Sequence, residues 1–361
     1  MNKNSIYIGI MTGTSCDGID ISAISVDPIS LKAHKTYSMP KKLQNKILEI
    51  ITNNHTSLSE LEIINRELSE VIKNKISVFI KEKKISKKRI IGIGLSGQTV
   101  RYQKYKKSFI SMQLAEPNLI SAYFKIPVIF DFRNSHISHG GMGAPLVKDF
   151  HIEVAGKVIN KFAFINLGGI ANYSVKKGAS SWGTDTGPAN ALMDEYCKNY
   201  LNKSFDRDGA IASKGKIHEK IIDELMDHAF FKKKYPKTTG KEDFNLSILP
   251  KKFLKKNKED ILATLCEFTA KSIFNALRKN NHLALKSYIV SGGGAKNKYL
   301  IERLNSYLDN KVLSSEKIGL PVDAVESMAF AWLAYKKLNN IPTLIKTNNK
   351  TVKAVIGSIS N

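Results

Sequence analysis

The chain has 361 residues, of which 42% are hydrophobic, so it can bury a large interior and does not have the composition of a disordered protein. This length exceeds one compact core of ordinary size and predicts two domains. Lys and Arg number 56 against 32 Asp and Glu, which gives a formal net charge of +24.

The positive charge raises the question of a nucleic-acid partner, and its composition argues against one. Seven of the 56 basic residues are Arg, whereas specific base reading depends on the bidentate Arg guanidinium. The densest Lys runs, at 81–89 and 231–237, fall at expected helix ends or in loops, and Lys near a helix C-terminus suits the dipole. We therefore expect no specific nucleic-acid partner, only a weak attraction to anionic surfaces.

The cysteines and the apolar runs indicate the cellular compartment in which the protein is expected. Cys16, Cys197 and Cys266 show no Cys-x-x-Cys pair and no metal spacing, as expected of reduced thiols in a cytosol. The apolar run near the N-terminus is too short for a signal peptide, and none reaches the roughly 18 residues of a membrane span. We expect a soluble cytoplasmic protein without a membrane partner.

The first half of the chain predicts strands and helices in alternation. A helix is expected at about 41–52, a second behind the capping box of Ser57 and Glu60, and a third opened by Pro117. A glycine-rich connection at 133–146 is the expected crossing between two lobes. The expected strands are 6–11, 20–26, 90–96, 108–114 and 127–132.

The second half repeats the opening plan. Residues 162–175 again indicate a strand, a polar glycine turn and a strand, and 285–297 indicate a strand followed by a glycine loop. Alternating strands and helices predict an α/β protein, and two halves that each open on such a hairpin predict two related lobes with a cleft between them. The expected helices are about 188–201, 217–230, 258–280, 298–308 and 321–338.

The first polar turn runs from Gly13 to Asp20 and is rich in glycine, hydroxyl and carboxylate groups. Glycine lets backbone N–H groups converge on an anion, and Thr14 and Ser15 add hydroxyl donors. Asp17 and Asp20 would repel phosphate oxygens but could hold Mg²⁺, directly or through its waters. A polar hairpin with Asp as turn former explains this stretch almost as well.

Two further glycine turns could also hold phosphate. Asn166, Gly168 and Gly169 open the second half, and the loop 292–294 joins a strand to a helix start, as nucleotide loops do. Neither GxGxxG with a downstream acid nor GxxxxGK[ST] is present, which argues against Rossmann and P-loop proteins. A plain hairpin and an N-cap at Asn297 are the alternatives.

Two acidic residues could carry catalysis. Asp185 is expected to end a short strand before a Thr186–Gly187 turn, with Pro188 at a helix start. An exposed carboxylate there could accept a proton from a hydroxyl or water, and an acid serving the helix dipole fits equally well. Glu326 lies within an otherwise apolar helix face, where it is either paired or functional.

Smaller groups of polar residues complete the candidates. Gln98, Thr99 and Arg101 follow a strand, as sugar-binding groups do, and Asp131 and Arg133 lie at another strand end. His136, His139 and His151 lack the regular spacing of metal ligands, and we expect them to be surface or core histidines.

Taken together, these motifs resemble the anhydro-N-acetylmuramic acid kinases of the actin/Hsp70/sugar-kinase superfamily. The family usually has Ser, His and Ala where this chain has Thr12, Ser96 and Ser327. "TGTSCDGID" and "DTGPAN" are rather specific to it, whereas "SGGGAKN" is shared by many sugar kinases. The matching segments, in family order from about residue 6 to 336, are "GIMTGTSCDGID", "SGQTVR", "DFRNSHISHGGMGAPLV", "FINLGGIANYSV", "TDTGPANALMD", "PKTTGKEDFNL", "VSGGGAKN" and "GLPVDAVESMAFAWLA".

The resemblance implies two actin-like (ribonuclease H-like) lobes with an ATP cleft between them. Residues 1–134 would form the first lobe, completed by 338–361, and 135–337 the second. The implied reaction uses ATP, Mg²⁺ and water to convert 1,6-anhydro-N-acetylmuramic acid to N-acetylmuramic acid 6-phosphate and ADP. This is a step of peptidoglycan recycling, and a homodimer is usual.

The resemblance implies that Gly13 to Asp20 bind ATP and that Asp185 is the base, and together with the motifs above it leads us to expect the following roles for individual residues. Asp185 would be the catalytic base, Glu326 would orient magnesium or water, and Asp17 would hold the metal. The substrate-binding residues would be Gln98, Thr99 and Arg133, and the hinge candidates are Gly140, Gly141 and Gly143. The ATP-binding residues would be Gly13, Thr14, Ser15, Cys16, Asp17, Gly18, Ile19, Asp20, Asn166, Gly168, Gly169, Gly292, Gly293, Gly294 and Asn297.

Three alternatives remain open on the residues alone. A plain sugar kinase would phosphorylate an open hydroxyl with the same base. A non-catalytic ATP switch of the actin or Hsp70 type would lack a sugar pocket, which "SGQTVR" and "DFRNSH" argue against. A basic nucleic-acid-binding protein is disfavoured by the few Arg residues.

Overall fold

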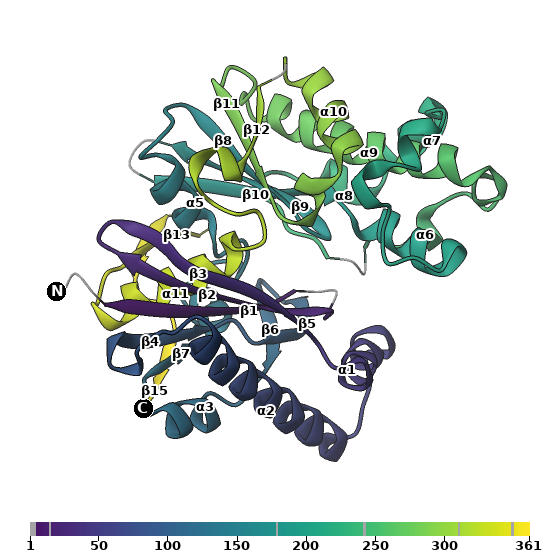
Figure 1. Cartoon of the computed structure of the whole chain (residues 1–361). Helices are drawn as coiled ribbons and strands as arrows, with labels where there is room; N and C mark the ends of the chain where they lie inside the picture. The colour runs from purple at the N-terminus through teal and green to yellow at the C-terminus, as the bar shows by residue number, and fades with distance from the viewer. Residues whose placement is uncertain (1–4, 14–15, 178–179, 241–242, 310, 348–349) are drawn as a thin grey trace. The chain divides into compact units, whose positions relative to one another are not determined.

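The computed structural model describes residues 5–13, 16–177, 180–240, 243–309, 311–347 and 350–361. The chain forms two compact units, each with its own sheet and hydrophobic core (Figure 1). Unit 1 consists of Met1–Phe150 with Asp323–Asn361, and unit 2 of His151–Val322.

Unit 1 is built on a mixed six-stranded sheet in the order β15-β7-β4-β1-β2-β3. The first three strands form an antiparallel meander, and β4 and β7 continue the sheet in parallel on the other side of β1. The hairpins β5–β6 and β13–β14 are separate. The strands are β1 (Ile6–Thr12), β2 (Gly18–Val26), β3 (Ile29–Ser38), β4 (Ile90–Leu95), β5 (Gln98–Tyr105), β6 (Ser108–Leu114), β7 (Val128–Phe130), β13 (Thr343–Lys346), β14 (Thr351–Ala354) and β15 (Ser358–Ser360).

The helices of unit 1 pack on the sheet through alternating strand positions. Ile8 and Ile10 of β1 belong to the core that also takes in the apolar stripe of α2, whereas Gly9 between them faces α11. The predicted cap of α2 is confirmed, because the Ser57 hydroxyl accepts a hydrogen bond from Glu60 N at 3.1 Å. The helices are α1 (Lys41–Asn53), α2 (Leu58–Glu82), α3 (Pro117–Phe124), α4 (Phe132–Ser138), α5 (Lys148–Ala155), which crosses into unit 2, and α11 (Val325–Leu338).

Unit 2 repeats this plan. Its sheet has the order β10-β9-β8-β11-β12, in which the first three strands are again an antiparallel meander and the last two continue in parallel beside β8. The order matches β3-β2-β1-β4-β7 of unit 1, which confirms the expected α/β class with two related lobes. The strands are β8 (Phe162–Leu167), β9 (Ile170–Lys177), β10 (Ser180–Pro188), β11 (Ser287–Ser291) and β12 (Val312–Ser314).

The long helix α9 (Lys258–Lys279) is the centre of the unit 2 core, with most residues between 260 and 277 buried. Its N-terminus is capped by the Asn257 side chain, which accepts a hydrogen bond from Asp260 N at 2.7 Å. The other helices are α6 (Ala191–Leu201), α7 (Glu219–Met226), α8 (Ala229–Lys232) and α10 (Lys298–Tyr307). No helix within the described ranges is both long and apolar enough to cross a membrane.

The division of the chain differs from the expected boundaries at 134/135 and 337/338. It falls at 150/151 and 322/323, so the glycine-rich connection 133–146 and helix α11 both belong to unit 1. The physical reason is close packing: a Cβ on Gly141 would lie 2.8 Å from Ile345 Cγ2 of β13, which belongs to unit 1. The hinge candidates Gly140, Gly141 and Gly143 are thus packed within unit 1 and not at the division.

Candidate active site

The first polar turn, between β1 and β2, is closed by a hydrogen bond from Cys16 N to Gly13 O at 3.1 Å. Thr14 and Ser15 lie outside the described residues. Cys16 has a positive φ of 54° and is fully buried in the core. This favours the interpretation of Cys16 as a small side chain in a tight turn and argues against a reactive thiol. Ile19 is also fully buried, so neither side chain is exposed to a ligand.

The two carboxylates of this turn differ in exposure. Asp17 is exposed, and its backbone carbonyl accepts a hydrogen bond from Met39 N at 2.9 Å. Asp20 is half-buried within β2, and its carboxylate accepts a hydrogen bond from the Thr36 hydroxyl of β3. Among the described residues no group of three or more His, Cys, Asp and Glu side chains could enclose a metal ion.

Residues 96–98 lie against this turn. Gln98 is fully buried and donates from Nε2 to Gly13 O at 3.2 Å, so the structure brings a predicted sugar-binding residue to the predicted ATP turn. Within the described part of the chain its Oε1 has no hydrogen-bond donor. Thr12 N donates to Ser96 Oγ at 3.4 Å. Two positions at which this chain differs from the usual residues of the family are therefore in contact.

Arg133 is held in place at the end of the glycine-rich connection. Its Nη1 donates to Gly143 O at 2.9 Å, and its guanidinium lies 5.5 Å from the centre of the Tyr102 ring. His136 accepts a hydrogen bond from Gly143 N on Nδ1. Burial, followed by the charges of Lys148 and Arg133, lowers the pKa of His136 to about 3, so this imidazole is neutral.

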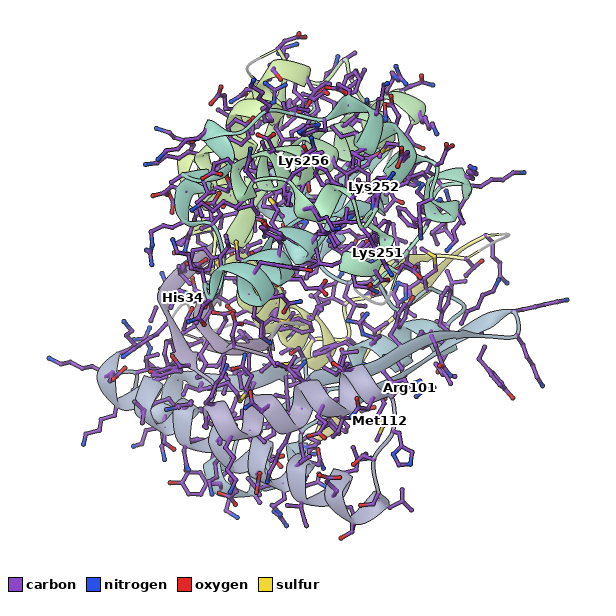
Figure 2. The ribbon with its side chains drawn as sticks, turned by 90° about the vertical axis from the view of Figure 1, so that its right-hand side faces the viewer. His34, Arg101, Met112, Lys251, Lys252 and Lys256 are labelled. Atoms are coloured by element: carbon purple, nitrogen blue, oxygen red, sulfur yellow. The ribbon has the colours of Figure 1, made fainter. Side chains whose placement is uncertain are left out.

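The remaining polar residues of the β5–β6 hairpin have separate surroundings. Thr99 is half-buried and accepts a hydrogen bond from Gln113 Nε2 at 3.3 Å. Arg101 turns to α1, where it binds Asn54, and it pairs across the hairpin with Met112; Figure 2 labels both residues.

Asp185 lies inside strand β10 of unit 2, opposite Asn172 of β9. It is 6% exposed, and its Oδ2 accepts hydrogen bonds from Thr238 Oγ1 at 2.9 Å and from Thr239 N at 3.0 Å. Its own N–H donates to Lys237 O at 3.0 Å. The side chain is therefore a buried carboxylate whose orientation is set by a segment more than 50 residues further along the chain.

This geometry corrects two expectations about Asp185. The strand does not end there: it continues through a bulge to Pro188, and α6 begins at Ala191, so Pro188 does not open the helix. The carboxylate is not exposed, and it lies six residues before the helix, too far to serve its dipole.

The two glycine turns of unit 2 meet at Asn190. Asn190 Nδ2 donates to Leu167 O and to Gly168 O, each at 2.9 Å. The other turn approaches the same place, since a Cβ on Gly294 would lie 2.8 Å from the Leu167 Cβ and 2.9 Å from Asn190 Oδ1. Only glycine allows this approach. The sequence motif "DTGPAN" contains Asn190, but nothing in its spacing predicted this contact.

The other residues of these turns are placed as follows. Asn166 is buried near Gly292, where a Cβ would lie 2.6 Å from Asn166 Oδ1, whereas Gly293 is exposed. Gly169 O accepts hydrogen bonds from the residues at the start of α6. Asn297 is the N-cap of α10, because its Oδ1 accepts from Leu300 N at 3.0 Å, as the capping alternative predicted.

Glu326 lies in the first turn of α11 in unit 1 and is half-buried. The neighbouring Ser327 hydroxyl donates to Ala324 O at 3.1 Å and lies 2.6 Å from Ser22 Oγ. Ser22 in turn lies 3.1 Å from Nδ1 of His34, which Figure 2 labels. Ser327, which stands where the family usually has Ala, thus has a polar partner on β2.

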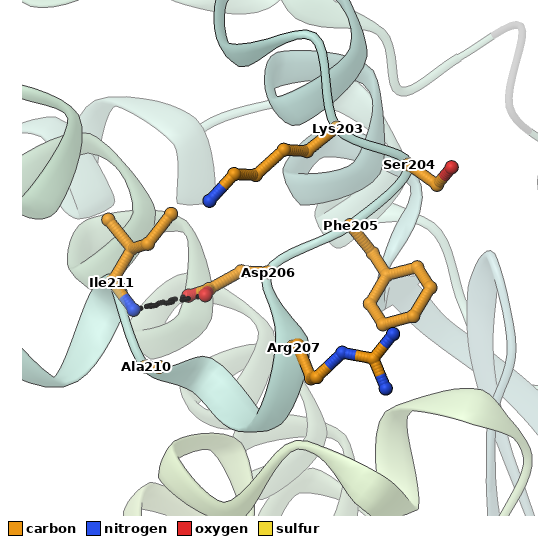
Figure 3. A pocket seen from close by; sticks show the side chains of 7 residues that line it. All are labelled: Lys203, Ser204, Phe205, Asp206, Arg207, Ala210 and Ile211. Carbon is orange, nitrogen blue, oxygen red and sulfur yellow. Dashed lines mark hydrogen bonds between the residues drawn. The ribbon is translucent and has the colours of Figure 1, made fainter.

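A cavity of about 410 Å³ in unit 2 is lined by none of these residues. Asp206 does not face it as a free ligand group: its carboxylate accepts hydrogen bonds from Ile211 N and Ala212 N, the first of which Figure 3 shows. The lining residues are Lys203, Ser204, Phe205, Asp206, Arg207, Ala210 and Ile211.

Comparison with known proteins identifies the family. The family model "Anhydro-N-acetylmuramic acid kinase" matches residues 5–360. The chain belongs to this family. A relative of that name from Gamma-proteobacterium EBAC31A08 is 46% identical over 360 residues, which cover 99% of each chain. Another from Vibrio vulnificus (strain CMCP6) is 34% identical over 349 residues, covering 95% of this chain and 94% of the relative.

Solved structures show the fold alone. The "Reductive activator for corrinoid,iron-sulfur protein" superimposes with a TM-score of 0.50 at 12% identity, covering 94% of this chain and 62% of that one. The sequence similarity of the family therefore carries the functional argument, and the structural likeness adds only that the paired α/β plan recurs in a distant protein.

Proposed function

We propose that this protein is an ATP-dependent kinase of peptidoglycan recycling that opens 1,6-anhydro-N-acetylmuramic acid with water and phosphorylates it, yielding N-acetylmuramic acid 6-phosphate and ADP. Membership of the family over residues 5–360 supports the substrate and the reaction class. The observation that carries the mechanism is the oriented, buried carboxylate of Asp185.

Asp185 is suited to act as a general base. The substrate has an internal bridge from C1 to O6, and Asp185 would take a proton from the water that attacks C1. The C1–O6 bond breaks as the C1–O bond forms, and O6 attacks the γ-phosphorus, which displaces ADP. No proton need be delivered to O6. Hydrogen bonds from Thr238 and Thr239 hold the carboxylate in one orientation, which a positioned base requires.

The glycine turns are suited to the phosphates. In unit 2 the loop 292–294 approaches the Asn166–Gly169 turn and the Asn190 side chain at distances that exclude a Cβ, so that a phosphate could come close to the glycine backbone there. In unit 1, Cys16 and Ile19 are buried, so the turn would act through its backbone and through Asp17 and Asp20. Preorganised donors of this kind stabilise the transferring phosphoryl group.

The acidic residues of the first turn fit Mg²⁺. This ion keeps several waters and takes one or two carboxylates together with phosphate oxygens, so it needs no cluster of three protein ligands. Exposed Asp17 meets that requirement, directly or through water, and half-buried Glu326 would orient a water. When bound, Mg²⁺ neutralises phosphate charge.

The sugar would be held in unit 1 by Gln98, Thr99 and Arg133. Gln98 Oε1 is a buried acceptor without a donor among the described residues, and the Arg133 guanidinium is fixed by Gly143 O and the Tyr102 ring. We also propose that the enzyme works in the cytoplasm as a homodimer, as the family resemblance implies. Light scattering of the purified protein tests the dimer.

The test of the function is ADP release with ATP, Mg²⁺ and 1,6-anhydro-N-acetylmuramic acid, beside N-acetylmuramic acid and glucose. Release with the anhydro sugar alone, and incorporation of ¹⁸O from labelled water at C1, would support the proposal. Release with an open sugar instead would make the protein a plain sugar kinase. No release with any of these sugars would overturn the proposal.

A further inference from the structure

We propose that Lys237 is a positioning residue for Asp185, acting through the segment that carries Thr238 and Thr239; this inference rests on the proposed role of Asp185 as the base. All four residues belong to unit 2. Lys237 lies in the segment "PKTTGKEDFNL", which resembles the family, but the residue pattern indicates no role for it.

Lys237 is a buried lysine in unusual surroundings. It is 3% exposed, and the charges that act on it come from Lys279 and Lys233, with no carboxylate among them in the described ranges. Its Nζ donates to Phe230 O at 3.0 Å and to Phe231 O at 3.4 Å. The same atom lies 4.2 Å from the centre of the Phe230 ring and 4.3 Å from that of Tyr235.

These contacts explain how a charge is tolerated there. A buried ammonium without a counter-ion is costly, and carbonyl oxygens at the end of a helix and aromatic faces offset part of that cost. Burial, followed by the charges of Lys279 and Lys233, lowers the pKa of Lys237 to about 8. An uncharged residue of the same length would fill this space at lower cost, so packing alone does not account for a lysine.

The backbone of Lys237 joins this anchor to Asp185. Lys237 N donates to Thr184 Oγ1 at 3.0 Å, and Lys237 O accepts from Asp185 N at 3.0 Å. The next two residues provide the donors to Asp185 Oδ2, Thr238 Oγ1 and Thr239 N. The ammonium therefore fastens one side of a short segment to α8, while the other side of that segment holds the carboxylate.

The consequence is that Lys237 sets the position of both donors without itself serving as a donor to Asp185. Its ammonium binds the carbonyls of Phe230 and Phe231. Removing these bonds leaves the segment held to β10 only by the backbone bonds of Lys237, so that Thr238 and Thr239 can shift and misplace the donors. A displacement of about 1 Å in a positioning group can cost about 100-fold in rate.

The test compares Lys237→Met with Lys234→Met. Methionine keeps the length and apolar stem of Lys237 and removes its donors, whereas Lys234 is exposed on the same segment and serves as the control. Amide hydrogen exchange at Asp185 and Thr239 should become about 10-fold faster in Lys237→Met and stay unchanged in the control, because these two N–H groups are in the bonds that would loosen.

The second readout is the pH profile of kcat. Hydrogen bonds to a carboxylate favour its charged form, so the acid limb should move to higher pH in Lys237→Met, with kcat about 10- to 100-fold lower and both KM values near wild type. A merely structural role would lower the amount of active enzyme and leave the acid limb in place. Thr238→Val should cause a similar shift, and the two changes should not add.

The outcomes separate this inference from the proposed function. Wild-type enzyme inactive on the anhydro sugar overturns the proposed function, while the exchange measurement still decides whether Lys237 holds the segment. Unchanged exchange in Lys237→Met, or faster exchange with an unmoved acid limb in an active enzyme, overturns the inference. If Lys237→Met does not fold, Lys237→Leu, which has no donor, must show the shift, and Lys237→Arg, which keeps donors, must not.

Discussion

Gly9 of β1 and Ser327 of α11 approach so closely that a Cβ on Gly9 would lie 1.9 Å from the Ser327 carbonyl oxygen. The carbonyl belongs to the backbone of α11, and a Cβ is fixed to the backbone of β1, so neither can move without displacing its element. We expect Gly9→Ala to push α11 off the unit 1 sheet and to lower the free energy of unfolding by at least about 3 kcal/mol. Urea denaturation followed by circular dichroism measures this.

Gly92 of β4 provides the matched control. A Cβ there would lie 2.5 Å from Leu338 Cδ1, the far end of a flexible side chain, which can rotate away. We expect Gly92→Ala to cost about 1 kcal/mol. Equal losses in the two variants would contradict the argument that the backbone contact of Gly9 is what requires glycine.

Asp185→Asn should remove the general base and keep the buried shape. We expect kcat to fall about 10²- to 10⁴-fold, with the KM for ATP little changed, because a positioned base contributes on this scale. Initial rates of ADP release at saturating anhydro sugar measure it. Asp227→Asn, which changes a carboxylate with 82% side-chain exposure, is the control and should retain the wild-type rate. Near-native turnover in Asp185→Asn would exclude this residue as the base.

Glu267 of α9 is 1% exposed and bound by Arg303 Nε at 2.5 Å and by the Tyr307 hydroxyl at 2.6 Å. Arg303→Met would leave a buried carboxylate without its cation, which should cost about 3–5 kcal/mol of unfolding free energy. Tyr307→Phe removes one hydrogen bond to the same group and should cost about 1.5–3 kcal/mol. Urea midpoints of the two variants check this order, and a larger loss in Tyr307→Phe would contradict it.

His151 should make stability depend on pH. The ring is fully buried and stacked 4.0 Å from Phe164, and burial lowers its pKa to about 3. The unfolded chain therefore takes up a proton below about pH 6.5 while the folded chain does not, so stability is full above that pH and falls by up to about 1.4 kcal/mol per pH unit below it.

The measurement is the urea midpoint between pH 7 and pH 4. His151→Gln should show a shallower loss than wild type, because the buried group no longer titrates in the unfolded chain. His55 is exposed, and His55→Gln should follow the wild-type curve. Parallel curves for wild type and His151→Gln would show that other groups cause the loss.

Asp17→Asn should weaken the use of Mg²⁺. The exposed carboxylate is the proposed ligand, so the Mg²⁺ concentration for half-maximal ADP release should rise about 10-fold, the loss typical of one charged contact. Asp27, an exposed carboxylate at the turn between β2 and β3, is the control. An unchanged requirement for Mg²⁺ in Asp17→Asn would remove this residue from the metal site.

Features that depend on neighbouring residues could be predicted from the sequence. The alternation of strands and helices, the Ser57 cap of α2 and the repeated strand–turn–strand hairpin that opens each unit follow from local pattern and capping chemistry. The strands β3 and β5 were not expected: β3 carries few buried side chains, so its pattern resembles that of a polar loop. The N-cap at Asn297 was one of the alternatives that the sequence left open, and it too joins near neighbours, since Asn297 Oδ1 accepts from Leu300 N.

The hydrogen-bond partners of Asp185 and the division between the two units depend on long-range packing, and the sequence did not predict them. Asp185 is held by residues more than 50 positions further along the chain, and Gly9 is in contact with a helix more than 300 positions away. Such pairings depend on which elements pack together, and the residue types on either side of Asp185 carry no sign of them. From the sequence, Asp185 could equally have been an exposed acid in a turn or an acid that interacts with a helix dipole. Its burial and its hydrogen bonds from Thr238 and Thr239 exclude both interpretations.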